Sequence, residues 1–288
     1  MNLTFNIHRC TNEIGGNCIE ISTETTRVIL DFGMPLVNPD KTEFNFNQCK
    51  DLSNSELVRK KILPDVEGLY DSGKKVINAV IISHPHLDHY GFMNFVKGDI
   101  PVYIGVAAKE LIEISNIFTP MNILFKSTHH YKHRKTFSIG DIKITPYLND
   151  HSAFDAYSFL IEGGGKRVFY SGDFRSHGRK EFMFNDLTDN PPENIDYLMM
   201  EGTNISKQAV NKTEKDIELE LMNLFNNSNK INLVYQAGQN IDRIVSVFKA
   251  CKASNKTLVL DVYLAYIMSK LVKTTGSRLP FPSKSFPN

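Results

Sequence analysis

The stretch SHPHLDH, residues 83–89, holds three of the nine histidines of this 288-residue sequence. A β-strand predicted over Val76–Ser83 leads into it, and Pro85 opposes helix at that point. His84 and His86 can therefore point to the same side of an extended turn, where two imidazoles can share one metal ion.

Asp88 and His89 come next, near the start of a helix predicted over Gly91–Val96. There the backbone begins to curl and can direct both side chains at a neighbouring position. The competing interpretation is a polar surface turn in which the aspartate caps the helix. Three histidines and one aspartate within six positions favour metal binding, and they indicate two adjacent sites.

Further candidate ligands each follow a predicted strand. They are Asp31 after Arg27–Leu30, His151 after the run Thr145–Leu148, and Asp173 after Lys166–Ser171. Strand ends on one rim of a sheet can converge, which would bring these groups to the histidines. Taken alone, Asp31 and Asp173 resemble ordinary turn residues, because DFG and GD are good turn formers.

The first two thirds of the chain are rich in predicted strands, and the last third alternates between helix and strand. The other strands expected in the first part are Cys18–Ile21, Asp141–Pro146 and Ser158–Glu162, with Gly163–Gly165 forming a hairpin turn. The elements expected after Glu201 are helix Thr213–Asn226, strand Ile231–Gln236, helix Asn240–Ser254, strand Thr257–Val262 and helix Tyr263–Lys273. The turn AGQN lacks the GxGxxG spacing, which argues against a dinucleotide cofactor.

Composition sets broader bounds. The length suggests two domains at roughly 150 residues each. Hydrophobic residues make up 41% and charged residues 23%, and no stretch approaches the ~20 apolar residues of a membrane-spanning helix. The start shows no secretory signal, so we expect a cytoplasmic protein without a membrane partner. The four scattered cysteines indicate free thiols. The formal charge of +1 argues neither for nor against nucleic-acid binding.

The sequence resembles the metallo-β-lactamase fold superfamily over roughly residues 14–175, through IGGNCIEI, LDFG, ISHPHLDH, NDHS and YSGDF. The resemblance implies an α/β fold, an αββα sandwich. It also implies that His84, His86 and His151 bind one ion, that Asp88 and His89 bind a second, and that Asp173 bridges both. Asp31 would orient the histidine loop from behind the ligands. Two zinc ions suit this ligand set, and manganese or iron also fits.

A second resemblance, through MMEGTNIS and AGQNIDRIVSVFKAC, is to the opening of a β-CASP domain. That branch consists largely of nucleases, typified by ribonuclease J. It implies a metallo-β-lactamase domain over residues 1–200 and part of a β-CASP domain over 201–288. Asp88 and Glu201 would be catalytic carboxylates, with Glu201 on the branch's first acidic motif. The branch's later histidine motifs have no match after His177, so we expect an N-terminal fragment whose first domain is completed beyond Asn288.

The implied reaction is phosphodiester hydrolysis by a metal-bound hydroxide, with RNA favoured over DNA. Alternatives left open are a DNA nuclease, a thioester or lactone hydrolase, an iron oxygenase and a non-catalytic scaffold; monomer and homodimer are equally open. EGTNIS and the α/β segment after it argue against small substrates, and the full ligand set argues against a scaffold. A basic group could contact phosphate or be a solvated loop: Arg175, His177, Arg179 and Lys180. A second histidine group is interpreted as solvated surface, with a basic rim that contacts phosphates as the alternative: His129, His130 and His133.

Overall fold

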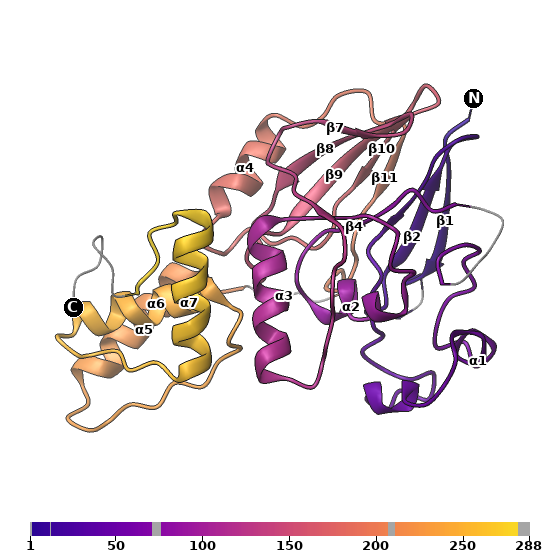
Figure 1. Cartoon of the computed structure of the whole chain (residues 1–288). Helices are drawn as coiled ribbons and strands as arrows, with labels where there is room; N and C mark the ends of the chain where they lie inside the picture. Colours follow the sequence, from indigo (N-terminus) through magenta and orange to yellow (C-terminus); the bar gives the residue numbers. More distant parts are fainter. Residues whose placement is uncertain (1, 12, 71–75, 207–210, 282–288) are drawn as a thin grey trace.

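Two mixed β-sheets packed face to face form the body of the protein in the computed structural model, which describes residues 2–11, 13–70, 76–206 and 211–281 (Figure 1). The strands of the first sheet, in spatial order, are β1 (Thr4–Arg9), β2 (Cys18–Ser22), β3 (Arg27–Leu30), β4 (Ala79–Ile82), β5 (Val102–Ile104) and β6 (Thr128–His129). Those of the second sheet are β11 (Tyr197–Met199), β10 (Lys166–Tyr170), β9 (Tyr157–Gly163), β8 (Ile142–Leu148) and β7 (Phe137–Ile139).

Each sheet is antiparallel in one part and parallel in the other. Strands β1, β2 and β3 pair antiparallel, whereas β3 to β6 run parallel. In the second sheet β7 to β10 are antiparallel and β11 joins β10 in parallel. The predicted hairpin between β9 and β10 is confirmed, since Gly164 and Gly165 supply the positive φ angles, 53° and 73°, that its tight turn requires.

The main core lies between the two sheets and follows the alternation of side chains along each strand. Leu30 and Ile81 of the first sheet meet Ile144 and Phe159 of the second, and all are fully buried. The opposite face of the first sheet packs against α1 (Asn54–Arg59) and α3 (Val106–Phe118).

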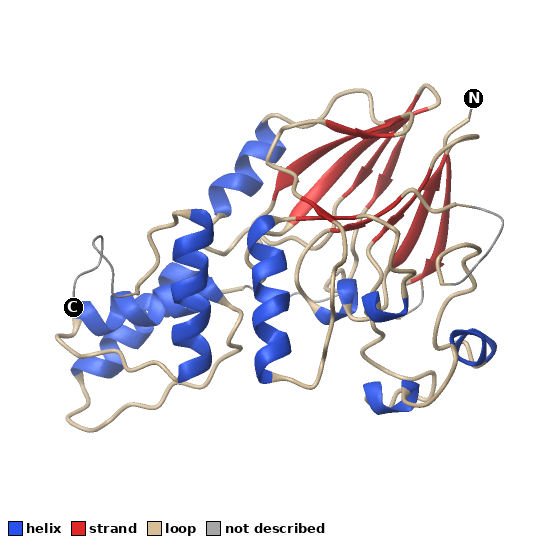
Figure 2. Cartoon of the chain, viewed as in Figure 1, coloured by secondary structure: helices blue, strands red, loops and turns tan. Residues whose placement is uncertain are grey.

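Helix α4 (Glu181–Asp189) covers the outer face of the second sheet, where Leu187 packs on Leu160 and Phe169. The resulting order, helix, sheet, sheet, helix, is the predicted αββα sandwich, which is confirmed (Figure 2).

In the described residues after the sandwich, the chain forms α5 (Glu214–Asn226), α6 (Ile241–Ala253) and α7 (Val262–Thr275). Their N-caps, Thr213, Asn240 and Asp261, each accept a backbone N–H of the first turn, which fixes where each helix begins. Helix α5 packs on α6, and α7 packs alongside α3 at the edge of the sandwich (Figure 1). Among the described residues, the helices all fall short of what crossing a membrane demands in length and apolar character.

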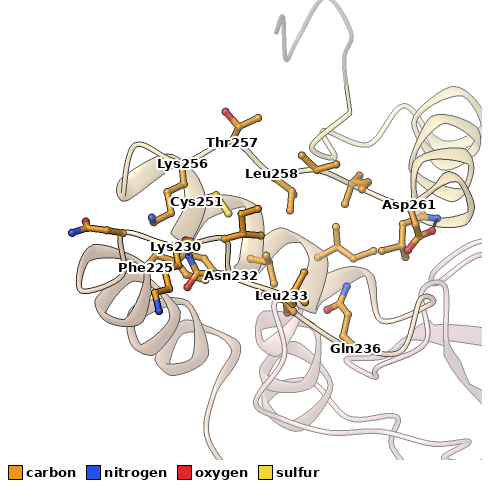
Figure 3. A pocket seen from close by; sticks show the side chains of 18 residues that line it. Phe225, Lys230, Asn232, Leu233, Gln236, Cys251, Lys256, Thr257, Leu258 and Asp261 are labelled. Atoms are coloured by element: carbon orange, nitrogen blue, oxygen red, sulfur yellow. Dashed lines mark hydrogen bonds between the residues drawn. The ribbon is translucent and has the colours of Figure 1, made fainter.

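The two strands predicted in this last third are not formed. Residues 231–236 and 257–261 form no helix or strand, and they pair with no strand among the described residues. They line an open hollow of about 820 Å³, with Leu233, Gln236 and Leu258 on its walls (Figure 3). Because a β-strand is stabilised by backbone hydrogen bonds to a neighbour, apolar composition alone did not make these segments a sheet.

The predicted helix Gly91–Val96 is also wrong. The chain instead forms α2 (Leu87–Tyr90) and a 3-10 turn, η2 (Met93–Phe95); another 3-10 turn, η1, spans Phe46–Cys49. Helix α2 stops because the Phe92 N–H donates to the carbonyl of Phe32, 3.1 Å away, in a distant loop. Asp88 and His89 therefore lie inside a short helix rather than ahead of a longer one.

Candidate metal centre

The candidate ligands stand at the ends of strands, as their positions in the sequence predicted. Strands β3 and β4 run parallel as neighbours, so Asp31 and Ser83 emerge side by side at one edge of the first sheet. His151 follows β8, and Asp173 follows β10 in the second sheet. The facing edges of the two sheets thus bring together residues up to 142 positions apart in the chain, from Asp31 to Asp173.

Three imidazoles, those of His84, His86 and His151, converge. Their ring centroids are 4.7–4.9 Å apart, and one ligand atom from each lies within 4.8 Å of the others. His151 Nε2 is 3.2 Å from His86 Nδ1. This is the set of three histidines expected around one ion.

A second group comprises His84, His89 and Asp173. Asp173 Oδ1 lies 3.3 Å from His89 Nε2, while its Oδ2 lies 3.8 Å from Nε2 of both His84 and His151. Asp173 therefore stands between the two groups, where a bridging ligand is expected. Asp88 is not one of these three, but its Oδ2 is 3.8 Å from His89 Nε2 and so borders the group.

Asp31 is a fully buried hydrogen-bond hub behind the histidines. Its Oδ2 accepts from Tyr170 Oη at 2.7 Å and from Ser83 Oγ at 2.8 Å, and it lies 2.8 Å from His89 Nδ1. Its Oδ1 accepts the Ser83 N–H at 2.6 Å. Asn17 Nδ2 also lies near His89 Nδ1, at 3.2 Å. Ser83, Asn17 and Tyr170 were not singled out from the sequence, although each lies in or beside a quoted motif.

The charges of the centre follow from burial and from neighbouring groups. Burial, together with the other histidines, lowers the pKa of His84 well below its usual value, and it lowers that of His151 to about 3. Burial also opposes protonation of His89, but Asp31 and Asp173 outweigh it and raise the pKa of His89 well above the usual value. Burial opposes ionisation of Asp173, yet His89 helps to hold its pKa at about 2.

These residues fit a divalent cation. His84 Nδ1 is 3.0 Å from Ser83 Oγ, whereas His84 Nε2 is buried and has no hydrogen-bond partner within the described part of the chain. A buried nitrogen without a partner is costly unless something else binds its lone pair. The low pKa values leave the imidazoles of His84 and His151 neutral and facing the ionised carboxylate of Asp173, which is a donor set that zinc prefers.

Glu201 lies behind Asp173. Its Oε1 accepts the backbone N–H of Phe174 at 3.1 Å, and its own N–H donates to Ser171 Oγ. It also lines a hollow shared with Asp88 and Asp173. Glu201 is thus placed beside the candidate centre and contacts the loop that carries Asp173.

The basic group after Asp173 is largely engaged in ion pairs. Arg175 pairs with Asp150 and Asp242, and Arg179 pairs with Glu218. The second histidine group divides: His129 is exposed and stacks on Tyr103, whereas His133 Nδ1 accepts the backbone N–H of Leu148. The four cysteines are free thiols, as predicted.

A sequence model of the Beta-lactamase superfamily domain matches residues 64–222, a span that contains every candidate metal ligand; Asp31, which contacts the His89 ring, precedes it. The chain belongs to the metallo-β-lactamase superfamily. Its two mixed sheets agree with the superfamily's fold, and its histidine and aspartate clusters suggest metal binding of the superfamily's type.

The proteins that this chain resembles in sequence include some that carry ribonuclease names. The chain is 24% identical over 270 residues to an "RNase J-like protein" of Methanocaldococcus jannaschii, covering 89% of this chain and 54% of that protein. It is 23% identical over 207 residues to a "Ribonuclease J" of Sinorhizobium meliloti, covering 69% of this chain and 36% of that one. The chain therefore spans about half the length, or less, of these two relatives.

A solved structure shares the fold. It is that of a protein of unknown function from Enterococcus faecalis, with a TM-score of 0.79, 22% identity, and coverage of 98% of this chain and 69% of the other.

Proposed function

We propose that this protein is a metal-dependent hydrolase that cleaves phosphodiester bonds, with RNA as the favoured substrate. The observation that carries the proposal is the convergence of His84, His86 and His151, in which the buried Nε2 of His84 has no hydrogen-bond partner among the described residues. Three neutral imidazoles with an adjacent carboxylate are typical of catalytic zinc sites.

Two ions are proposed. His84, His86 and His151 would hold the first, Asp88 and His89 the second, and Asp173 would contact both. Zinc is favoured, and manganese or iron would also fit the nitrogen and oxygen donors. Such ions supply Lewis-acid chemistry: they lower the pKa of water and stabilise negative charge on a phosphodiester oxygen.

The protein's own groups prepare this site. Asp31 orients the His89 ring through the 2.8 Å contact at Nδ1, which leaves Nε2 directed at Asp173. Glu201 holds the Phe174 amide directly after Asp173, so we propose that it supports the bridging carboxylate beside the reacting groups. Asp88, at the border of the second group, is the proposed catalytic carboxylate.

The choice of RNA rests on similarity. The two relatives described above carry ribonuclease names, and each is matched over most of this chain. We further propose the domain boundary near residue 200, because β11, the last strand among the described residues, ends at Met199 and helices α5–α7 follow. A cytoplasmic location stays a prediction, and both a monomer and a homodimer stay open.

The test compares hydrolysis of labelled single-stranded RNA, DNA of the same sequence and a thioester by the zinc-loaded protein. We expect RNA cleavage that a chelator abolishes and that Asp88→Ala lowers by at least about 100-fold. The matched control is His129→Ala, which removes an exposed imidazole away from the centre and should cleave at the wild-type rate.

Unchanged RNA cleavage by Asp88→Ala would reject the mechanism. Thioester hydrolysis without RNA cleavage would favour the small-molecule alternative, and equal or faster cleavage of DNA would favour a DNA nuclease.

A further inference from the structure

A buried ion pair joins the two loops that carry His151 and Asp173. Arg175 lies two residues after Asp173, and its backbone N–H donates to the Asp150 carbonyl at 2.7 Å. Its Nε also donates to Asp150 Oδ1 at 3.4 Å. Asp150 is fully buried and directly precedes His151. A shift of Arg175 would therefore move both ligand-bearing loops.

The other side of Arg175 is held by a residue outside the sandwich. Asp242, in the first turn of α6, accepts from Arg175 Nη2 at 2.5 Å and from the Arg179 N–H at 3.0 Å, both on Oδ2. Its side chain is 8% exposed. A carboxylate this buried is costly without hydrogen-bonded partners, so the contact is strongly specified.

A second cationic side chain, that of Lys180, also links Asp242 to the His151 loop. Lys180 Nζ lies 3.6 Å from Asp242 Oδ1 and donates to the backbone carbonyl of His151 at 3.4 Å. Asp242 thus reaches the His151 loop by two routes, one through Arg175 and Asp150 and one through Lys180.

These contacts make a phosphate-binding role for Arg175 unfavourable. Its side chain is 11% exposed, and carboxylates occupy its guanidinium at Nε and at Nη2. A substrate phosphate would have to displace one of these charged partners. The planar guanidinium is instead suited to bridging two carboxylates at fixed geometry.

We propose that Asp242 is a positioning residue for the metal centre: through Arg175 and Lys180 it holds the loops of His151 and Asp173 in place. The arrangement of α6 would then set how well the centre binds its ions. The proposal rests on the proposed metal site but is independent of which substrate is cleaved. Groups that orient ligands from behind typically change metal affinity by about 10–100-fold.

The experiment measures zinc affinity by competition with a chromophoric chelator, and ligand geometry by the absorption spectrum of the cobalt-loaded protein. For Asp242→Asn, which keeps the side-chain shape and removes the charge, we expect about tenfold weaker zinc binding and an altered cobalt spectrum. The second variant, Arg175→Lys, keeps a charge but cannot bridge both carboxylates, and it should show the same loss. It keeps the test decisive if Asp242→Asn does not fold.

The matched control is Glu214→Gln. Glu214 is as buried as Asp242 and belongs to the same helix pair, but its carboxylate bonds Arg243 and Ser246 rather than the 175–180 segment. Its zinc affinity should stay within about twofold of wild type.

Wild-type affinity and spectrum in folded Asp242→Asn or Arg175→Lys would overturn the proposal. An equal loss in Glu214→Gln would also overturn it, because general packing of α5 and α6 would then be the cause. Failure of the wild-type protein to bind zinc would instead overturn the metal site and the proposed function.

Discussion

Replacing Asp31 by asparagine should both destabilise the fold and weaken the metal centre. Asp31 is fully buried, and its two oxygens are surrounded by four groups on three residues: the Ser83 N–H and hydroxyl, the Tyr170 hydroxyl and His89 Nδ1. An asparagine has the same shape but replaces one oxygen by an NH₂ donor. In either orientation that NH₂ meets at least one group that now donates to Asp31.

The expected cost can be worked from these contacts. A buried donor left without an acceptor costs about 1–3 kcal/mol, and removing one partner of a buried ion pair costs about 3–5 kcal/mol. The two costs overlap because both involve His89, and His89 keeps Asp173 as a second partner 3.3 Å away. We therefore expect Asp31→Asn to lower the free energy of unfolding by about 3 kcal/mol. Since the His89 ring loses its orienting contact, zinc affinity at the second group should fall about 10–100-fold.

Urea unfolding monitored by circular dichroism gives the stability, and chelator competition gives the affinity. The control is Asp141→Asn, an exposed aspartate that accepts from Thr23 Oγ1 at the surface and should change neither quantity appreciably. An Asp31→Asn protein within about 0.5 kcal/mol of wild type, with undiminished zinc affinity, would refute the reasoning.

Two further predictions concern the scaffold. A hydrogen bond from His8, followed by one from Arg27, lowers the pKa of Glu20 to about 2, so its stabilising effect is present above pH 4.5 and is lost as the pH falls through 2. Glu20→Gln should thus lower the free energy of unfolding by about 1–2 kcal/mol at pH 7, which is less than the whole pKa shift would give because water partly screens the pair. Near pH 2 the substitution should cost almost nothing. Unfolding curves that show the same difference in free energy between Glu20→Gln and wild type at both pH values would contradict this. A Cβ at Gly33 would lie 1.6 Å from the Asp88 carbonyl oxygen, whereas one at Gly202 would meet nothing within 4 Å. Gly33→Ala should therefore lose zinc binding or fold poorly while Gly202→Ala behaves as wild type, and similar melting temperatures and zinc content for the two would exclude this explanation.

Local pattern was enough to predict much of the sandwich and the candidate centre. Strand Arg27–Leu30 was predicted with the bounds the structure gives it, because its apolar run is short, β-branched and closed by a turn. The idea that polar residues after strands converge at one edge also placed His151 and Asp173 near His84. These inferences succeed because they depend on neighbours in the chain and on general sheet geometry.

Local pattern failed where a segment's state depends on a distant partner. Residues 231–236 have the composition of a strand, yet whether they pair is decided by what lies beside them. Helix α2 ends at Tyr90 because of a hydrogen bond from Phe92 to Phe32, sixty residues earlier. Neither outcome can be predicted from the hydrophobic periodicity of the segment itself.

The sequence by itself determined which chemical groups this protein can offer a metal: the histidines of residues 84–89, with His151 and Asp173 at later strand ends. Only the tertiary structure decided what Arg175 does, because its partners Asp150 and Asp242 lie 25 and 67 positions away. The physical reason is that a side chain's type fixes its possible interactions, whereas burial and the groups packed around it decide which interaction it makes.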